Sequence, residues 1–148
     1  MIRYARETLE SWDEAWPLVE SHYHEIAHFQ DLALKPNRDG YLQCEAAGGI
    51  RVYTVRDDGR LVGYQVFLVS LNLHYSDSLQ AIQDVLYLAP LLRGRLIGYR
   101  FIRWCDEQLR AEGVEVVAQH VKVKHDFGPM LTRMGYELME NVYVKRLI

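Results

Sequence analysis

The sequence predicts a single α+β domain over residues 1–148, built on a mixed, mostly antiparallel sheet of about six strands with helices on both faces. One observation is the order of apolar patterns, which alternate or recur every three to four residues in the sequence β-α-α-β-β-β-α-β-α-β. A second is that short turns join the three consecutive strands in the middle of the chain, which favours an antiparallel meander. A chain of 148 residues can bury a core without disulfide or metal support.

The composition is typical of a soluble globular protein, because 49% of the residues are hydrophobic and 25% are charged. The net charge of −3 does not indicate a nucleic-acid-binding or membrane-surface protein, and we expect neither kind of partner. The two cysteines, Cys44 and Cys105, form no disulfide framework, which favours a reducing, cytoplasmic setting. No apolar run has the length that a signal peptide or a membrane span needs.

The first third of the chain predicts a short strand and two helices. The strand covers Met1–Arg6, and a helix with one apolar stripe begins near Thr8 or Ser11. A shorter helix covers Tyr41–Ala47, because the glycine pair at 48–49 ends it.

The middle third predicts the meander. Its first strand, Ile50–Arg56, alternates between apolar and polar residues, and Asp57–Arg60 has the composition of a hairpin turn. The second strand covers Leu61–Leu73, and a turn over His74–Asp77 leads into a third strand that ends at Leu88.

A short glycine-bearing turn follows the meander and opens a helix. Pro90 stops the strand because it cannot donate to a ladder, and the helix runs from Arg93 to about Gly113. A strand, a turn and a helix in this order can hold phosphate, because the first N–H groups of a helix have no internal partner and carry partial positive charge. Arg95 and Arg100 add full charges that can grip a phosphate, as does Arg93.

The last part of the chain predicts two further strands around a short helix. The first strand covers Val114–Val123, and Asp126 caps a helix that runs through Met134. Gly135 ends this helix, and Tyr136–Leu147 forms the strand that closes the sheet.

At the turn after Pro90 the chain resembles the GNAT superfamily of acyl-CoA-dependent N-acetyltransferases, and it is also similar to small acetyltransferases encoded by phages. The family carries R-x-x-G-x-G/A after its fourth strand, and Arg93, Ile97 and Gly98 fit this motif, whereas Leu96 stands where the middle glycine is usual. The order of elements is also that of the family.

The resemblance implies acetyl-CoA as co-substrate and no metal. In the family the loop cradles the pyrophosphate of coenzyme A, and the acetyl-pantetheine arm lies in a gap between the fourth and fifth strands. Backbone groups at the end of the fourth strand then bind the arm, and the N–H near Leu88 is a candidate oxyanion donor. The implied cofactor-binding residues are Leu86, Tyr87, Leu88, Arg93, Gly94, Arg95, Leu96, Ile97 and Gly98.

Asp84 is the candidate general base, because it is the polar interruption in an otherwise apolar strand. Strand alternation predicts that it lies on the same face as Leu86 and Leu88, partly buried beside them. The alternative role for Asp84 is structural, pairing with an arginine or capping a loop. Other candidates for a catalytic role are Glu25, His74, His24 and Tyr75, which belong to segments that usually wall the acceptor site in the family.

The acid that protonates the leaving thiolate is missing from its usual place. Many family members have a tyrosine four residues before the final glycine-aromatic pair, which is Gly135-Tyr136 here, and that position holds Leu131. Leucine cannot donate a proton. Tyr136, Tyr143 and water are the alternatives.

The stretch from His24 to His28 matches H-E-x-x-H, which on a helix is the signature of zinc proteases. The one nearby candidate for a third ligand is Glu45. We favour a polar wall of the acceptor pocket over a zinc site, and we expect His22 and His28 to be solvated.

We therefore predict a cytoplasmic N-acetyltransferase that moves an acetyl group to a primary amine on a small molecule or a protein. Acidic residues near the first helices favour a cationic acceptor: Glu20, Glu25, Asp31 and Glu45. Leu96 and Leu131 favour the alternative, which is a GNAT-fold module with weak or no catalysis that binds CoA or a protein. A zinc hydrolase is the third hypothesis, and a homodimer is a possible assembly.

Overall fold

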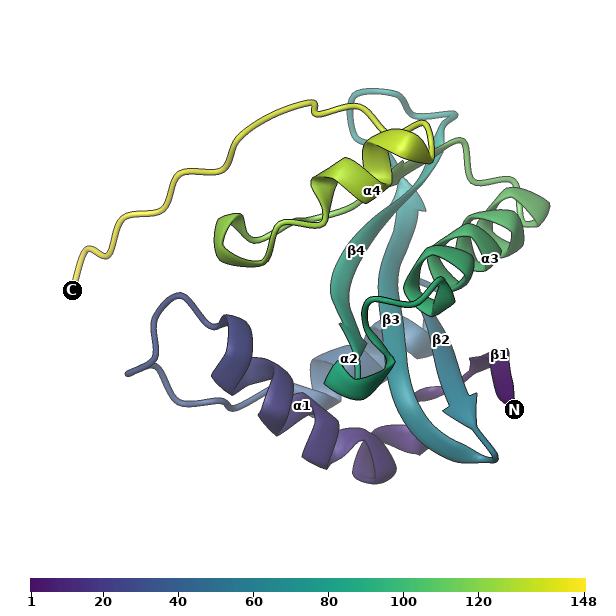
Figure 1. Ribbon diagram of the computed structural model, residues 1–148. Helices are drawn as coiled ribbons and strands as arrows, with labels where there is room; N and C mark the ends of the chain where they lie inside the picture. The colour runs from purple at the N-terminus through teal and green to yellow at the C-terminus, as the bar shows by residue number, and fades with distance from the viewer.

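The computed structural model describes residues 1–148, and its centre is a five-stranded mixed sheet in the order β1-β2-β3-β4-β5 (Figure 1). The strands are β1 (Ile2–Glu7), β2 (Ile50–Asp57), β3 (Arg60–Leu71), β4 (Leu79–Leu88) and β5 (Val116–Ala118). The first three pairings are antiparallel, and two of them, β2–β3 and β3–β4, are those of the predicted meander; β4 pairs with β5 in parallel. The helices are α1 (Trp12–Ile26), α2 (Arg38–Ala46), α3 (Ile97–Ala111) and α4 (Gly128–Arg133). Single 3₁₀ turns are η1 (Leu9–Ser11), η2 (Pro90–Leu92) and η3 (Val123–His125).

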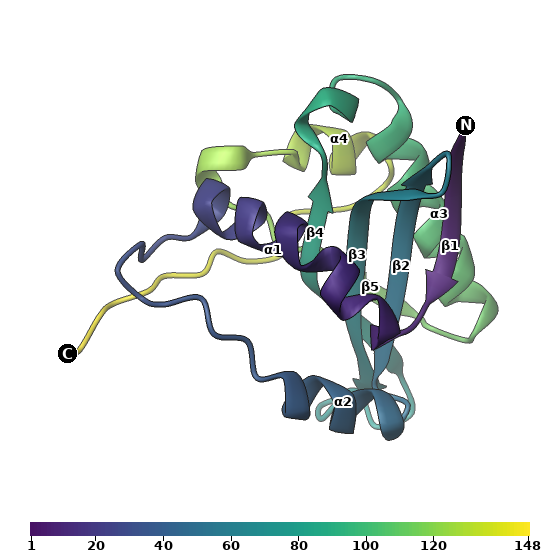
Figure 2. The same cartoon turned by 90° about the horizontal axis from the view of Figure 1, so that it is seen from below.

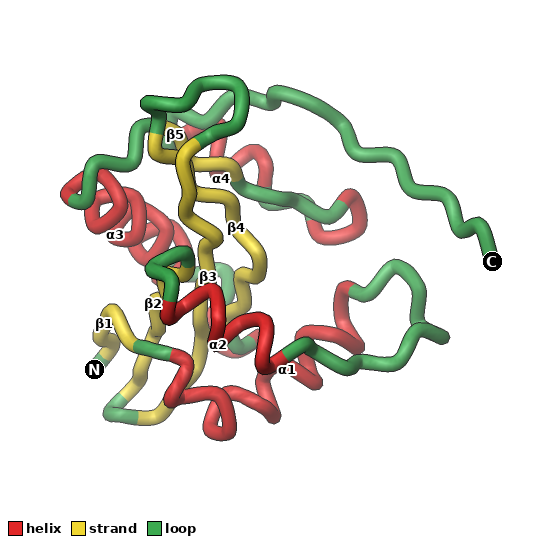
Figure 3. Tube along the Cα trace, turned by 180° about the vertical axis from the view of Figure 1, so that it is seen from behind, coloured by secondary structure: helices red, strands yellow, loops and turns green.

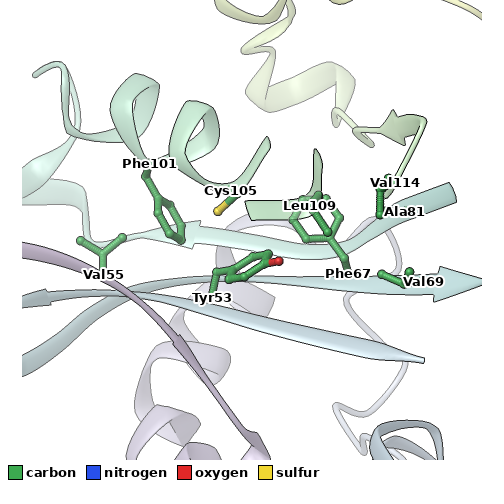
Figure 4. Packing of buried hydrophobic residues seen from close by; sticks show 9 residues of the cluster. All are labelled: Tyr53, Val55, Phe67, Val69, Ala81, Phe101, Cys105, Leu109 and Val114. Carbon is green, nitrogen blue, oxygen red and sulfur yellow. The ribbon is translucent and has the colours of Figure 1, made fainter. Parts of the chain in front are cut away.

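Helices cover both faces of the sheet, with α1 and α2 on one face and α3 and α4 on the other (Figures 1 and 2). Under α3 lies the larger core, which Figure 4 shows from close by: Tyr53, Val55, Phe67, Val69, Ala81, Phe101, Cys105, Leu109 and Val114. The helical spacing of the α3 residues in this list puts one stripe of the helix against alternate residues of the strands. A smaller cluster on the opposite face joins Leu9, Ile50, Val52 and Val66 to Trp12 of α1 and Tyr41 of α2.

A β-bulge interrupts β4 in its middle. Val66 pairs with Val85 and Phe67 pairs with Gln83, so Asp84 is an extra residue on β4 with no partner in β3. The bulge reverses the alternation of side chains beyond it. Ala81 therefore packs in the core under α3, and so do Leu86 and Leu88 at the far end of the strand.

The prediction of a sixth strand over Tyr136–Leu147 is wrong, because the sheet has five strands. Residues 136–148 form neither helix nor strand, and they extend away from α4 (Figure 3). No strand of the sheet pairs with the segment, and near its end Arg146 pairs with Asp31 of the α1–α2 loop. Strand-forming residues do not make a strand without a neighbour to pair with. Most of the large apolar side chains here are exposed: Leu138, Met139, Val142, Tyr143, Val144, Leu147 and Ile148.

Other predicted boundaries shift for local reasons. The helix expected from Arg93 begins at Ile97, because Gly94 has a positive φ of 76° that no helix contains. The strand expected over 114–123 shortens to β5, since its partner β4 diverges after Ile82. The second helix begins at Arg38, where Asn37 Oδ1 caps it by accepting the Gly40 N–H at 3.0 Å. None of the helices is long and apolar enough to cross a membrane.

Candidate functional site

The turn between β4 and α3 presents a row of free backbone donors. The N–H groups of residues 94–99 make no hydrogen bond within the protein, and the first α3 donor in the ladder is Arg100, to the Leu96 carbonyl at 2.9 Å. The helix dipole adds partial positive charge at the same place. These donors lie one after another along the turn and are therefore suited to an anion with several oxygens, such as a pyrophosphate.

A pocket of about 570 Å³ lies beside these donors, between the turn and α4. Its lining residues are Gly94, Arg95, Leu96, Tyr99, Met130 and Arg133. Arg95 and Arg133 are exposed and form no ion pair, so both guanidinium groups are available to a ligand. Sequence reasoning missed Arg133, although it stands one helical turn after Met130 on the helix that faces the loop.

Arg93 does not join this pocket. Its guanidinium makes a bidentate ion pair with Glu25 of α1 at 2.5 and 2.8 Å, and its Nε donates to the Leu88 carbonyl at 2.7 Å. Arg93 is therefore not free to bind phosphate in this arrangement, because its donors already have partners, and its role in CoA binding stays a prediction. It instead ties the end of α1 to the end of β4.

The same contact weakens Glu25 as a candidate base. The hydrogen bonds from Arg93 hold the pKa of the Glu25 carboxyl below its usual range, and both carboxylate oxygens are occupied. His125 adds to this cluster by contacting the Glu25 carbonyl at 3.0 Å. A carboxylate with a lowered pKa takes up a proton poorly, so Glu25 fits a positioning role better.

A gap opens between β4 and β5. Their pairing covers residues 80–82 of β4, and β4 then continues to Leu88 without a neighbour on that side. The Ala89 N–H bonds to Val62 of β3, and a Cβ at Gly63 would lie 2.8 Å from the Tyr87 carbonyl oxygen. Backbone groups alternate in direction along a strand, so those of Leu86 and Leu88 point into the gap.

Asp84 stands where this gap begins, but on the face opposite to the one predicted. The bulge turns it toward α2, where its carboxylate accepts a hydrogen bond from the Tyr41 hydroxyl. Its side chain is exposed, so the expected burial beside Leu86 and Leu88 does not occur. Burial and the bond to Asp84 raise the pKa of Tyr41, which keeps that hydroxyl a donor.

His22 is a residue that the sequence analysis assigned wrongly to solvent. It is 8% exposed, its Nδ1 lies 3.1 Å from the Tyr64 hydroxyl, and its ring lies 5.2 Å from the ring of Tyr87. Burial lowers the pKa of His22 to about 4, so the imidazole is neutral at pH 7. The sequence did not indicate this burial, because a histidine within a stretch of charged residues is usually exposed.

His74 and Tyr75 lie elsewhere. They belong to the turn that precedes β4, and a strand of this length puts that turn about 30 Å from Leu88. Both side chains are exposed. The structure therefore does not bring His74 together with Asp84 or with the end of β4.

The H-E-x-x-H stretch lacks the geometry of a zinc helix. The helix α1 ends at Ile26, so His28 lies beyond it and does not share a helical face with His24. Glu45, the nearby candidate for a third ligand, accepts the Leu9 N–H at 2.8 Å. No group of three or more His, Cys, Asp and Glu side chains is placed to hold a metal ion.

The structure also shows where the candidates for the acid that protonates the thiolate lie. Leu131 is buried in the core, Tyr143 is exposed on the C-terminal segment, and the Tyr136 hydroxyl donates to Asp106 of α3 at 2.7 Å. Burial raises the pKa of Tyr136, and the bond to Asp106 adds to this. A tyrosine that holds its proton this firmly is a weak acid, so water fits the task better than Tyr136.

No protein-family model matches the sequence, and no curated protein matches it. Solved structures match over nearly the whole chain. An aminoglycoside acetyltransferase from an uncultured soil metagenomic sample, in complex with sisomicin, is 16% identical with a TM-score of 0.75, covering 99% of this chain and 97% of its own. A GCN5-related N-acetyltransferase from Ralstonia eutropha JMP134 is 16% identical with a TM-score of 0.76, covering 99% of both chains.

A predicted acetyltransferase from Clostridium acetobutylicum, solved with acetyl-CoA, is 9% identical with a TM-score of 0.68, covering 99% of this chain and 97% of its own. The fold is therefore that of the GNAT acetyltransferases. At these identities the likeness is one of fold, and the chemistry has to be argued from the residues of this chain.

Proposed function

We propose that this chain is a cytoplasmic acetyl-CoA-dependent N-acetyltransferase that acts on a primary amine. One observation carries the proposal: the gap beside Leu86 and Leu88 joins a face with free N–H donors and arginines to a face with Asp84. A long anionic thioester can enter from the α3 and α4 side, and an amine can approach from the α1 and α2 side. The two then meet within the sheet.

The residues present fit acetyl-CoA. The N–H groups of residues 94–99, with Arg95 and Arg133, supply donors and positive charge for its phosphates. When bound, acetyl-CoA supplies an activated acetyl group as a thioester. The Leu88 N–H faces the gap and is placed to stabilise negative charge that develops on the thioester oxygen. Asp84 takes the proton of the amine, directly or through water.

The region where the acceptor would bind has fewer free acidic side chains than the sequence suggested. Three of the four acidic residues that favoured a cationic acceptor already have partners, because Glu25 pairs with Arg93, Asp31 pairs with Arg146 and Glu45 accepts the Leu9 N–H. These contacts remove the reason to prefer a cation. Small-molecule and protein amines both stay open, and homodimer formation stays a prediction.

The second candidate is a CoA-binding module without turnover. Burial of Leu131 favours this candidate. Leu131 stands at the usual place of the acid and packs in the core, so a small rotation cannot bring a proton donor to that place. A CoA thiolate needs little help to leave near neutral pH, so this observation favours slow turnover as well as none.

The test is turnover of acetyl-CoA with a panel of polyamines, amino sugars and peptides, followed by free-thiol release and by mass spectrometry of each amine. We expect thiol release that depends on one class of amine and an acetylated product of that class. CoA binding without any acetylated amine would contradict the proposal and leave the binding module. Absence of CoA binding, together with bound zinc by elemental analysis, would instead favour the hydrolase.

A further inference from the structure

Gln65 of β3 holds a buried acceptor that has no partner. The residue is 0% exposed, and its Oε1 makes no hydrogen bond within the protein. The one other buried side-chain atom in this condition is the hydroxyl of Tyr53, which packs in the core under α3. Buried acceptors are nearly always satisfied in folded proteins, so an unsatisfied one needs an explanation.

The position of Gln65 beside the gap suggests what could bind this acceptor. Gln65 pairs in register with Leu86, within the part of β4 that has lost its β5 neighbour. It shares the α3 face with Phe67, two residues away on the same strand. Its Nε2 donates to Gln119 Oε1 at 2.8 Å, and Gln119 directly follows β5. The side chain therefore reaches across the gap from β3 to the chain beyond β5.

A chain of hydrogen bonds fixes which atom of Gln65 is left free. The Tyr136 hydroxyl donates to Asp106 at 2.7 Å, so it accepts from Gln119 Nε2, at 3.5 Å. The Oε1 of Gln119 therefore faces Gln65, and Gln65 donates to it through Nε2. Both amides are held in one orientation by Asp106, and the free atom of Gln65 is the oxygen.

We propose that Gln65 Oε1 binds the pantetheine arm of acetyl-CoA by accepting a hydrogen bond from one of its amide N–H groups. This inference rests on the proposed function. Gln65 lies opposite Leu86, so an arm that occupies the gap beside Leu86 and Leu88 comes close to this side chain. The arm offers two amide N–H donors, and its one hydroxyl lies nearer to the pyrophosphate. Gln65 is thereby a positioning residue, which sets how far the arm enters.

The variant Gln65→Met tests the proposal, because it keeps the size of the side chain and removes the acceptor, together with the Nε2 donor to Gln119. We expect three results from calorimetry and thermal unfolding. The affinity for CoA falls about tenfold, the usual worth of one neutral hydrogen bond. The affinity for adenosine 3′,5′-bisphosphate, which lacks the arm, stays unchanged. The unliganded variant should unfold close to the wild-type temperature, because the loss of an unsatisfied acceptor offsets the loss of the Nε2 bond to Gln119.

Gln83→Met is the matched control for stability. Gln83 is also buried, at 6% exposed, but its Oε1 accepts the His120 N–H at 2.7 Å. Removing it leaves a donor without its partner, so this variant should unfold at a lower temperature. Of the two buried glutamines, Gln83 is thus expected to show the larger loss of stability on replacement by methionine.

A second measurement changes the ligand and begins with the wild-type protein. Two CoA analogues, each with an ester in place of one amide of the arm, lack one N–H each. One of them should bind the wild type about tenfold more weakly than CoA binds the wild type. The same analogue and CoA should bind Gln65→Met with equal affinity.

Equal CoA affinity of Gln65→Met and wild type would overturn the inference alone, as would equal binding of CoA and both analogues by the wild type. An equal loss for CoA and the bisphosphate would also overturn it, because it would show a general disturbance. A wild type that binds no CoA would overturn the proposed function and this inference with it.

Discussion

Asp84→Asn should lower kcat for acetyl transfer by about 10²-fold or more, the usual scale for the loss of a general base, with the CoA affinity little changed. A protonated amine has no lone pair with which to attack a thioester, so the site must remove a proton near pH 7. Asp84 is the acid that the β4 bulge places where the gap opens. Steady-state kinetics with the best acceptor of the panel, and calorimetry with CoA, are the measurements.

Part of the lost rate should return at high pH, where the free amine is abundant. Asp77→Asn is the control, because Asp77 is also exposed but lies in the turn before β4, far from the gap. Tyr41→Phe removes the hydroxyl that holds the Asp84 carboxylate and should cause a smaller loss than Asp84→Asn. Near wild-type kcat for Asp84→Asn at neutral pH would assign Asp84 a structural role.

The double variant Arg95→Glu and Arg133→Glu should weaken CoA binding by on the order of 10²-fold or more, because each arginine is expected to lose a charge-assisted hydrogen bond to phosphate. Both side chains are exposed and unpaired, so folding should be intact. Calorimetry measures the affinity, and thermal unfolding verifies the fold.

The matched control is Arg3→Glu with Arg60→Glu, which changes the net charge equally at two exposed sites on the strands β1 and β3. It should weaken CoA binding far less than the pocket variant does, because neither arginine lines the pocket. A folded Arg95 and Arg133 variant with unchanged affinity would show that CoA does not use this pocket.

Local patterns predicted the fold well, and the reasons are visible in particular elements. Alternation and the turn at Asp57–Arg60 gave the meander, and the stripe through Phe101 and Cys105 gave α3. These patterns depend on neighbours within a few residues. The missing sixth strand over Tyr136–Leu147 needed knowledge of a pairing partner, which depends on where the whole segment runs.

The site was harder to predict, because its decisive contacts join distant parts of the chain. The pair of Glu25 and Arg93 spans 68 residues, and nothing near either residue indicates it. The face of Asp84 depended on a bulge, and one extra residue reverses every assignment by alternation. The free acceptor of Gln65 follows from bonds that link β3, α3 and the ends of β5 and α4.

The most direct test of the account is a titration of the ¹⁵N-labelled protein with CoA, followed by the backbone amide resonances. The account predicts the largest shifts at the N–H groups of residues 94–99, with further shifts at Leu86 and Leu88, whose backbone groups face the gap. Shifts confined to other segments, or no shifts up to about 1 mM CoA, the upper end of usual substrate KM values, would contradict it.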